Sequence, residues 1–505
     1  MIYNISLAVG FEKSGVDTAM ASRAAFFEKA GLESCFIFGK LPNLRELKLY
    51  RECGMNPARM LTVPLSFTDC SDITPKLAPR SVCMKMPEGL FCDEIEETEE
   101  YIALKKEHST VAAIDFDGYG CVHSVVYFQQ MKIFRRDFYS DHCYASEFYN
   151  IEHNHLITIK REYYNTDGSV ALEQILQDDE TRYMLPNGQS FREAELCNEF
   201  IRRLKTSEND IFILDRPHYF FSQDEIMKLG QKCRIIAVLH SDHFFKKGLS
   251  TFGVGTNREY MYWFKYSNCL SDMIVSTVEQ KRLLEEYLKR RGYAVPKISA
   301  IPVCGIPKLK LCNGPRTKKN ILCASRLNPR KKVEWSIAAV IKSHETDREI
   351  SLDIYGSGDS TYVERLKKIV SDHQAESYIH FMGHCDLAEV YQKYSIFLTT
   401  SIWETLGITL MEACAAGLAI VGLDVQYGNH CFIRDGKNGF MVPYDPAYIE
   451  QESPKELVDN LSNALLKLTS DEKLLDKFGK CSYEIAEQYL EDKVQNEWLG
   501  LLKNG

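Results

Sequence analysis

The sequence lacks any closely paired cysteine motif. Its 17 cysteines form an odd number scattered over 505 residues, and no two of them are spaced as Cys-x-x-Cys. A disulfide framework needs an even, patterned set, and a structural zinc site usually draws on such close pairs. Neither is expected here. The simpler interpretation is free thiols in a reducing cytosol.

Long apolar runs are also lacking. No stretch reaches the roughly 18 apolar residues that a membrane-spanning helix needs. The first residues, MIYNISLAVGFEKSG, have no basic segment followed by a long apolar one, so they do not predict a signal peptide. We therefore expect a cytoplasmic protein, and leave open a peripheral contact with the inner face of the cell membrane.

A surplus of basic charge is missing too. Lysine and arginine number 61 against 70 aspartates and glutamates, which gives a net charge of -9. Nucleic-acid-binding domains are usually basic, so no nucleic-acid partner is expected. Hydrophobic residues make up 45% of the chain, enough for ordinary globular cores. A chain of this length predicts two or three domains.

The last third alternates short apolar runs with helical patterns. The predicted strands are 321–325, 351–356, 378–383, 395–401 and 418–424, and the predicted helices include a stretch from about Lys332, 361–373, 387–394 and 409–417. Strand–helix alternation with short links predicts a parallel sheet covered on both faces. A ligand should then bind at the carboxyl ends of the strands.

The rest of the chain divides into two patterns. The first 40 residues and 205–305 alternate in the same way, whereas 75–200 shows period-2 runs separated by Asp-Gly and Asn-Gly turns, as in an antiparallel meander. The predicted fold is α/β, with the meander inserted into the first of two Rossmann-like domains. The expected domains are 1–77 with 201–308, the insertion 78–200, a second domain 309–480, and a C-terminal helical segment 481–505 packing back on the first domain.

The segment TTSIWETLGITLMEACAAG carries the sharpest pattern. Glu404 lies in the loop after a predicted strand, and Glu412 about one turn into the following helix. A helix N-terminus suits a diphosphate, carboxylates can accept hydrogen bonds from sugar hydroxyls, and Gly407 lets the backbone come close to a ligand. The alternative is two solvated glutamates beside an ordinary helix start, and spacing alone favours that alternative.

Two further loops carry candidate residues. Arg326 and Lys331 follow a predicted strand in ASRLNPRKK, where two cations could neutralise two phosphates. A solvated basic loop explains them equally well. Gly10 and Gly15 bracket the first strand-to-helix loop, which could admit a phosphate or sugar or be an ordinary turn. The GSG at 356–358 is interpreted as a structural turn.

The segment VLHSDHF places His240 at the end of a predicted strand, three residues before His243. Two histidines at this spacing could bind a metal. No carboxylate or cysteine completes a convincing set, so no metal site is expected. No GxGxxG motif follows either first strand, which argues against a nucleotide-dependent oxidoreductase.

Taken together, these motifs resemble the family-4 retaining glycosyltransferases of the GT-B type. SRLNPRKK and ETLGITLMEA are similar to that family's SRL-x-x-E-K and E-G-F-G-L-T-L-x-E-A, and DGKNGFMVP extends the likeness. The N-terminal half is similar to the subgroup that modifies serine-rich adhesins with N-acetylglucosamine, whose cousins glycosylate wall teichoic acid. The resemblance implies two Rossmann-like domains facing a cleft.

The resemblance also implies roles for single residues. Arg326 and Lys331 would hold the diphosphate of a UDP-sugar, Glu412 the ribose and Glu404 the transferred sugar. His240 would lie near the reaction centre, Gly15 near the donor phosphate, and the backbone at Thr409 and Leu410 would add phosphate contacts, with Gly407 before them. No metal and no other cofactor would be needed.

The sequence departs from the family pattern at Thr405, Leu406 and Arg330, which stand for the usual Gly, Phe and Glu. The identity of the donor sugar therefore stays open. By resemblance, the acceptor is a serine-rich protein, and the insertion binds a homologous partner subunit, with self-association as the alternative. Two other functions stay open: a wall teichoic acid glycosyltransferase, and a non-catalytic sugar-nucleotide-binding subunit.

Overall fold

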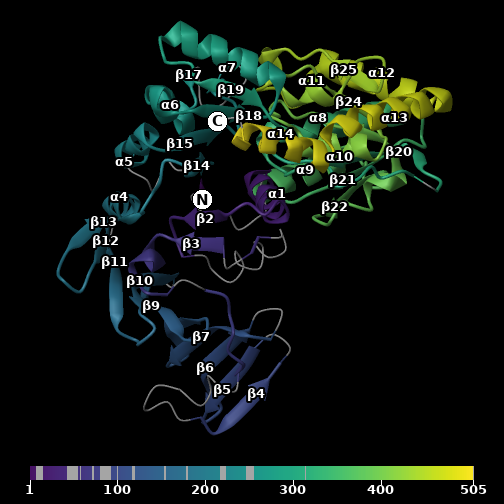
Figure 1. The fold of residues 1–505 in the computed structure, drawn as a ribbon. Coiled ribbons are helices and arrows are strands. Elements are labelled where there is room, and N and C mark those ends of the chain that lie inside the picture. Colours follow the sequence, from purple (N-terminus) through teal and green to yellow (C-terminus); the bar gives the residue numbers. More distant parts are fainter. Residues whose placement is uncertain are drawn as a thin grey trace. The chain divides into compact units, whose positions relative to one another are not determined.

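The computed structural model describes residues 1–505 except 7–14, 42–54, 57–58, 71–72, 80–91, 99–100, 117–119, 153–154, 178–179, 216–222, 246–254, 313 and 504–505. The chain divides into two compact units. The first is Met1–Val238 with Tyr266–Asp272, and the second is Leu239–Lys265 with Met273–Gly505. Parallel and antiparallel sheets together give the α/β class (Figure 1). The domain boundaries inferred above stay a prediction.

The first unit begins with parallel strands. β1 (Ile2–Ser6) pairs with β2 (Ser34–Phe38) and β14 (Ile211–Leu214), and β3 (Met60–Thr62) and β15 (Arg234–Val238) extend the order to β15-β14-β1-β2-β3. Strands buried on both faces read as continuous apolar runs, as IFIL and RIIAV do here. Helices α1 (Gly15–Lys29) and α5 (Gln223–Lys228) belong to the same unit.

Ten strands of the first unit form one antiparallel sheet in which sequence neighbours pair. The meander expected in this part of the chain is confirmed. Gly168 and Gly188 adopt φ of 84° and 86° at its Asp-Gly and Asn-Gly turns, and the 117–118 turn lies outside the described residues. The strands are β4 (Glu94–Glu97), β5 (Tyr101–Lys106), β6 (Ser109–Phe116), β7 (Val122–Gln129), β8 (Lys132–Tyr139), β9 (Cys143–Glu152), β10 (His155–Tyr164), β11 (Val170–Gln177), β12 (Glu180–Met184) and β13 (Ser190–Arg192), followed by helix α4 (Glu193–Arg203).

The second unit holds a six-stranded parallel sheet with the order β22-β21-β20-β23-β24-β25. Its core is apolar side chains from the strands and from α8 and α12, such as Trp335, Leu352 and Leu461. The strands are β20 (Thr317–Ala324), β21 (Ser351–Tyr355), β22 (Ile379–Gly383), β23 (Tyr394–Leu398), β24 (Ala419–Leu423) and β25 (Gly439–Val442). Helices α6 (Arg258–Lys265) and α7 (Val278–Arg291) of this unit precede the sheet in the chain. The helices after β20 are α8 (Val333–Thr346), α9 (Ser360–Asp372), α10 (Ile408–Ala415), α11 (Gly428–Phe432), α12 (Lys455–Thr469), α13 (Glu472–Ala486) and α14 (Glu491–Lys503).

One predicted element is wrong. The stretch 387–394 was expected to be a helix, but it contains only a short 3-10 turn, Tyr391–Lys393. Tyr394 already belongs to β23, so too few residues remain for a stable α-helix. The side chain of Tyr391 is fully buried, and tertiary packing decides the conformation of this segment.

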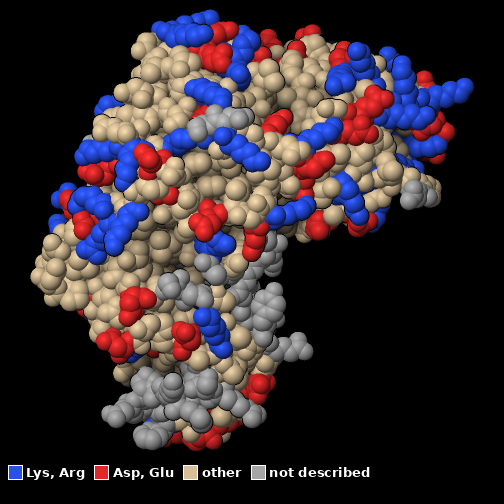
Figure 2. Space-filling model, in the orientation of Figure 1, with Lys and Arg blue, Asp and Glu red and all other residues tan. Residues whose placement is uncertain are grey.

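The surface carries both signs of charge. On the face drawn in Figure 2, Lys and Arg side chains are interspersed with Asp and Glu side chains. Among the helices that the structure describes, none is long and apolar enough to cross a membrane.

Candidate functional site

Two loops of the second unit meet because the strands that precede them are neighbours. β20 and β23 pair in parallel, with Ile321 opposite Ile396. The carboxyl ends of parallel strands open at one edge of a sheet, which is where α/β proteins bind ligands. The loop after β20 carries Arg326 and Lys331, and the loop after β23 carries Glu404.

Backbone contacts hold these two loops together. The hydroxyl of Thr400 donates to the carbonyl oxygens of Lys331 and Lys332, at 3.2 and 2.7 Å. The N–H of Ile402 donates to the carbonyl oxygen of Arg330 at 3.2 Å. The loop after β20 is therefore fastened to the loop after β23 immediately before Glu404.

Lys331 and Glu404 form an ion pair. The Lys331 Nζ lies 2.5 Å from the Glu404 Oε1, and the two side chains are only 20% and 14% exposed. A charge-assisted contact of this length in a half-buried setting fixes both groups. Lys331, predicted to bind a diphosphate, and Glu404, predicted to contact a sugar, are therefore in direct contact. The sequence pattern did not predict this contact.

The backbone of the Glu404 loop packs on the first residue of α11, Gly428. The N–H of Gly428 donates to the Glu404 carbonyl oxygen at 3.0 Å. A Cβ at Gly428 would lie 2.2 Å from the carbonyl oxygen of Leu406, so only glycine permits this close packing. Tyr427, which precedes it, is buried with φ of 71°, an uncommon value for a residue other than glycine.

Helix α10 begins directly after this loop. Gly407 adopts φ of 84° in the left-handed region and is the N-cap of the helix, as a glycine can be without strain. The backbone N–H groups of Thr409 and Leu410 lie in the first turn, where a helix leaves N–H groups without intrahelical partners and carries a partial positive charge. This geometry fits an anion-binding helix start.

Glu412 lies one turn into α10, as predicted. Its Oε2 accepts a hydrogen bond of 2.9 Å from the hydroxyl of Tyr391, whose side chain is fully buried. Burial, and then the negative charge of Glu412, raise the pKa of Tyr391 well above its ordinary value, so the phenol stays a donor. Tyr391 therefore orients the carboxylate of Glu412, and sequence reasoning missed it.

Two arginines follow β20. Arg326 is exposed and makes no ion pair or hydrogen bond with the described part of the chain. The guanidinium of Arg330 lies 4.6 Å from the ring centroid of Trp403, in a cation–π contact next to Glu404. Burial lowers the pKa of Arg330, with Glu259 and Asp242 acting in the opposite sense.

His240 lies in the loop after β15, and buried side chains hold that loop. The backbone N–H groups of His240 and Ser241 both donate to the hydroxyl of Tyr260, at 3.0 and 2.8 Å. The amide of Asn257 donates to the Asp242 carbonyl oxygen at 2.9 Å. His240 itself is half-buried, on a loop of fixed conformation.

His243 lies three residues after His240, in the same loop. It is fully buried and packs against the rings of Phe244 and Tyr287. No group of three or more potential metal ligands occurs among the described residues. Gly15 is the exposed first residue of α1, while Gly10 and the rest of that loop lie outside the described residues.

The six residues Lys331, Glu404, Gly407, Thr409, Leu410 and Glu412 thus come together along the loops after β20 and β23 and the start of α10. Arg326 follows β20 in the second unit. His240 follows β15 but already belongs to the second unit, which begins at Leu239, whereas Gly15 belongs to the first unit. Such a fold and site fit a glycosyltransferase of the GT-B class.

Comparison with known proteins supports this class. Residues 318–466 match the family model described as glycosyl transferases group 1, and residues 93–187 match the GtfA extended beta-sheet domain. The GtfA subunit of the UDP-N-acetylglucosamine–peptide N-acetylglucosaminyltransferase of Streptococcus gordonii is 30% identical, over 99% of this chain and 98% of that protein. The chain therefore belongs to the family of GtfA subunits.

Solved structures of GtfA proteins are similar to this chain over its whole length. The pneumococcal O-GlcNAc transferase GtfA in complex with UDP and GlcNAc has a TM-score of 0.86 at 28% identity, covering 100% of this chain and 98% of that one. A GtfA/B complex gives 0.83 at 28% identity over 100% and 99%. The poly(ribitol-phosphate) alpha-N-acetylglucosaminyltransferase of Staphylococcus aureus is a more distant relative, 23% identical over 64% of this chain and 61% of that protein.

Proposed function

We propose that this protein transfers N-acetylglucosamine from UDP-N-acetylglucosamine to serine and threonine hydroxyls of a serine-rich protein. The observation that carries the proposal is the contact of Lys331 with Glu404 beside the start of α10. It occurs in a chain that matches the S. gordonii peptide N-acetylglucosaminyltransferase subunit over nearly its whole length.

The donor is bound by charge and by backbone N–H groups. Arg326, Lys331 and the first turn of α10 neutralise the diphosphate, and Glu412, oriented by Tyr391, accepts hydrogen bonds from the ribose hydroxyls. When the donor binds, the Lys331 ammonium contacts phosphate and the Glu404 carboxylate accepts a hydrogen bond from the sugar. Fixed cations and a helix terminus stabilise the leaving group, so we propose that no metal is required.

The chemistry is a front-face displacement with retention. The bond between the anomeric carbon and the phosphate oxygen breaks while a bond to the acceptor hydroxyl oxygen forms on the same face. The hydroxyl proton passes to the departing phosphate. From the resemblance to the family, we propose a role for His240 near the reaction centre and one for Gly15 near the donor phosphate.

The antiparallel sheet has a separate task in this proposal. It matches the GtfA extended beta-sheet domain, and a GtfA/B complex is among the similar structures. We propose that it binds a homologous partner subunit that helps to capture the acceptor. Leu156, Ile157 and Ile159 of β10 are 46%, 39% and 40% exposed. Because neighbouring strand residues point to opposite faces, these apolar side chains are accessible on both faces of the sheet, where a partner could cover them.

A deletion tests the role of this sheet. Residues 78–200 are replaced by a short linker, and mass in solution and transfer to a polymeric acceptor are measured with and without the partner. We expect loss of assembly and of polymer glycosylation, with donor hydrolysis retained. A deletion variant that assembles and transfers like the wild type would contradict both roles.

Peripheral contact with the inner face of the cell membrane stays a prediction.

The activity itself is tested with a panel of UDP-sugars and two acceptor classes, a serine-rich polypeptide and a polyribitol phosphate. Acceptor mass is then read directly. Transfer of N-acetylhexosamine to the polypeptide is expected. Transfer to the polyol phosphate alone would favour the teichoic acid alternative, and donor binding without transfer to either would favour a non-catalytic subunit.

A further inference from the structure

The turn that presents Lys331 has an unusual backbone. Lys332, between the 3-10 turn Pro329–Lys331 and helix α8, adopts φ of 48° and ψ of 41°. A lysine in the left-handed region costs about 1 kcal/mol or more, so neighbouring groups must hold it there. The conformation also decides where Lys331, the preceding residue, is directed.

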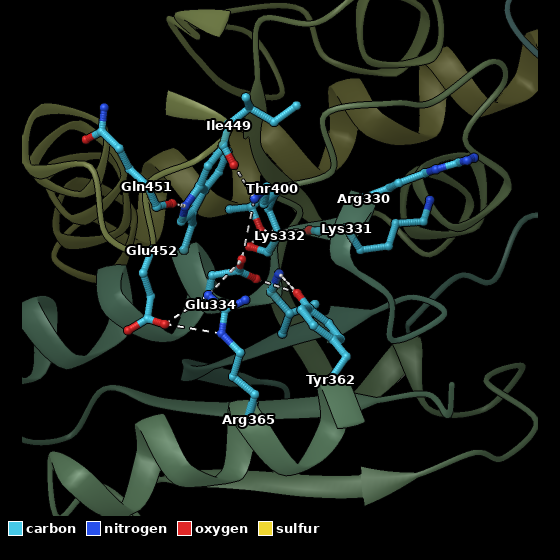
Figure 3. Close-up of polar contacts among 12 residues, drawn as sticks. Arg330, Lys331, Lys332, Glu334, Tyr362, Arg365, Thr400, Ile449, Gln451 and Glu452 are labelled. Carbon is cyan, nitrogen blue, oxygen red and sulfur yellow. Dashed lines mark hydrogen bonds and ion pairs between the residues drawn. The ribbon is translucent and has the colours of Figure 1, made fainter. Parts of the chain in front are cut away.

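Tyr362 holds this turn from the first turn of α9. Its hydroxyl accepts a hydrogen bond of 3.0 Å from the N–H of Val333 and donates one to the Oε2 of Glu334. Tyr362 is 4% exposed and Glu334 is 1% exposed, so both contacts are shielded from water. Figure 3 shows Tyr362 and Glu334 facing each other beneath the turn.

Glu334 also faces two cations. The Lys332 Nζ lies 3.7 Å from its Oε1, and a guanidinium nitrogen of Arg365 lies 3.9 Å from the same atom. A buried carboxylate is stable only with such partners. The Lys332 Nζ also donates to the Ile449 carbonyl oxygen at 2.6 Å, so the side chain of the left-handed residue is held at its tip.

The GSG turn supports the other half of the same loop. A Cβ at Gly356 would lie 1.9 Å from the Ser325 carbonyl oxygen, and one at Gly358 would lie 2.0 Å from that of Leu327. Leu327 N–H also donates to the carbonyl oxygen of Ser357 at 2.8 Å. The segment from this turn to Tyr362 therefore supports the loop after β20 along its length.

We propose that Tyr362 and Glu334 are positioning residues that set the place of Lys331 in the donor site. The inference rests on the proposed function, because it takes Lys331 to bind the donor diphosphate. In Figure 3, Arg330 and Lys331 extend from the turn away from Glu334. Tyr362 and Glu334 thus act on the donor through the backbone of the turn and not by contact.

The test replaces Tyr362 by phenylalanine and measures UDP binding by calorimetry together with the melting temperature. Tyr394→Phe is the matched control, because Tyr394 is also 4% exposed and its hydroxyl donates to the carboxylate of Asp353 at 2.6 Å. Both variants should lose similar stability. Only Tyr362→Phe should weaken UDP binding, by about tenfold, since a small misplacement of a binding group is enough for such a loss. Equal UDP affinities of the two variants would overturn the proposal.

A double variant distinguishes the positioning role of Tyr362 from the proposed donor-binding role of Lys331. If Tyr362 acts through Lys331, then Lys331→Ala with Tyr362→Phe binds UDP no more weakly than Lys331→Ala alone. Additive losses would overturn the positioning role. If Lys331→Ala leaves UDP binding unchanged, the donor site itself is misplaced and the proposed function fails.

Should Tyr362→Phe not fold, Glu334→Gln carries the same test. Its amide oxygen still accepts the hydrogen bond of Tyr362, while the charge that faces Lys332 is lost. Weaker UDP binding is expected, and an unchanged dissociation constant would overturn the proposal.

Discussion

The variant Gly428→Ala tests whether activity depends on the close packing of the Glu404 loop against Gly428. The new Cβ would lie 2.2 Å from the Leu406 carbonyl oxygen, and real Cβ atoms essentially never come closer than 3.0 Å to such atoms. Because the clash is with backbone, rotation of a side chain cannot relieve it, and the two segments must separate by about 1 Å. Leu406 lies between Glu404 and Gly407, so the shift reaches both the carboxylate and the start of α10. A displacement of about 1 Å can lower turnover about 100-fold.

The assay compares turnover, UDP affinity and melting temperature in three variants. Gly439→Ala introduces a similar clash, 1.9 Å from the Ile420 carbonyl oxygen, between β24 and β25 and away from the loop. Gly500→Ala meets no atom within 4 Å. Gly428→Ala and Gly439→Ala should both lose about 1–3 kcal/mol of stability, but only Gly428→Ala should lose most of its turnover while folded. A folded Gly428→Ala with wild-type turnover would refute the reasoning.

Three further predictions follow from the same site. Glu404→Gln should lower transfer by about 10- to 150-fold, because a charged hydrogen bond contributes about 1.5–3 kcal/mol. Glu349→Gln is the control. The Glu349 carboxylate also lies 2.5 Å from a lysine, the Nζ of Lys319, but it is 76% exposed, and its loss should not change transfer. Near-wild-type transfer by Glu404→Gln would place the sugar elsewhere. Tyr391→Phe should weaken UDP binding about fivefold through a less well oriented Glu412, since a neutral hydrogen bond contributes about 1 kcal/mol; an unchanged affinity contradicts that role. Transfer should continue in EDTA, and activity that is lost there and restored by manganese would show that a metal is required.

The sheets could be predicted because their strands have distinct patterns. Buried parallel strands such as AIVGL in β24 are continuous apolar runs, and the meander strands alternate and end at Asp-Gly or Asn-Gly turns. Strand β21, Ser351–Tyr355, ends one residue earlier than the strand 351–356 expected from the sequence. The helix start at Gly407 and the place of Glu412 follow from the same local signals.

The contacts of the site could not be predicted in this way. Lys331 and Glu404 are 73 residues apart in the chain and meet only because β23 lies beside β20 in the sheet. No local pattern states that order. The roles of Tyr391 and Tyr362 could not be predicted either. In the sequence, a buried tyrosine cannot be told from any other core residue until the partner of its hydroxyl is known.

The central claim is tested most directly by the mass of a serine-rich polypeptide after incubation with this protein, its partner subunit and UDP-N-acetylglucosamine. The account predicts mass increases in whole N-acetylhexosamine units with the wild type, and increases at least about tenfold slower with Glu404→Gln, whose fold is checked by melting temperature. An unmodified polypeptide, with transfer to polyribitol phosphate under the same conditions, would contradict it.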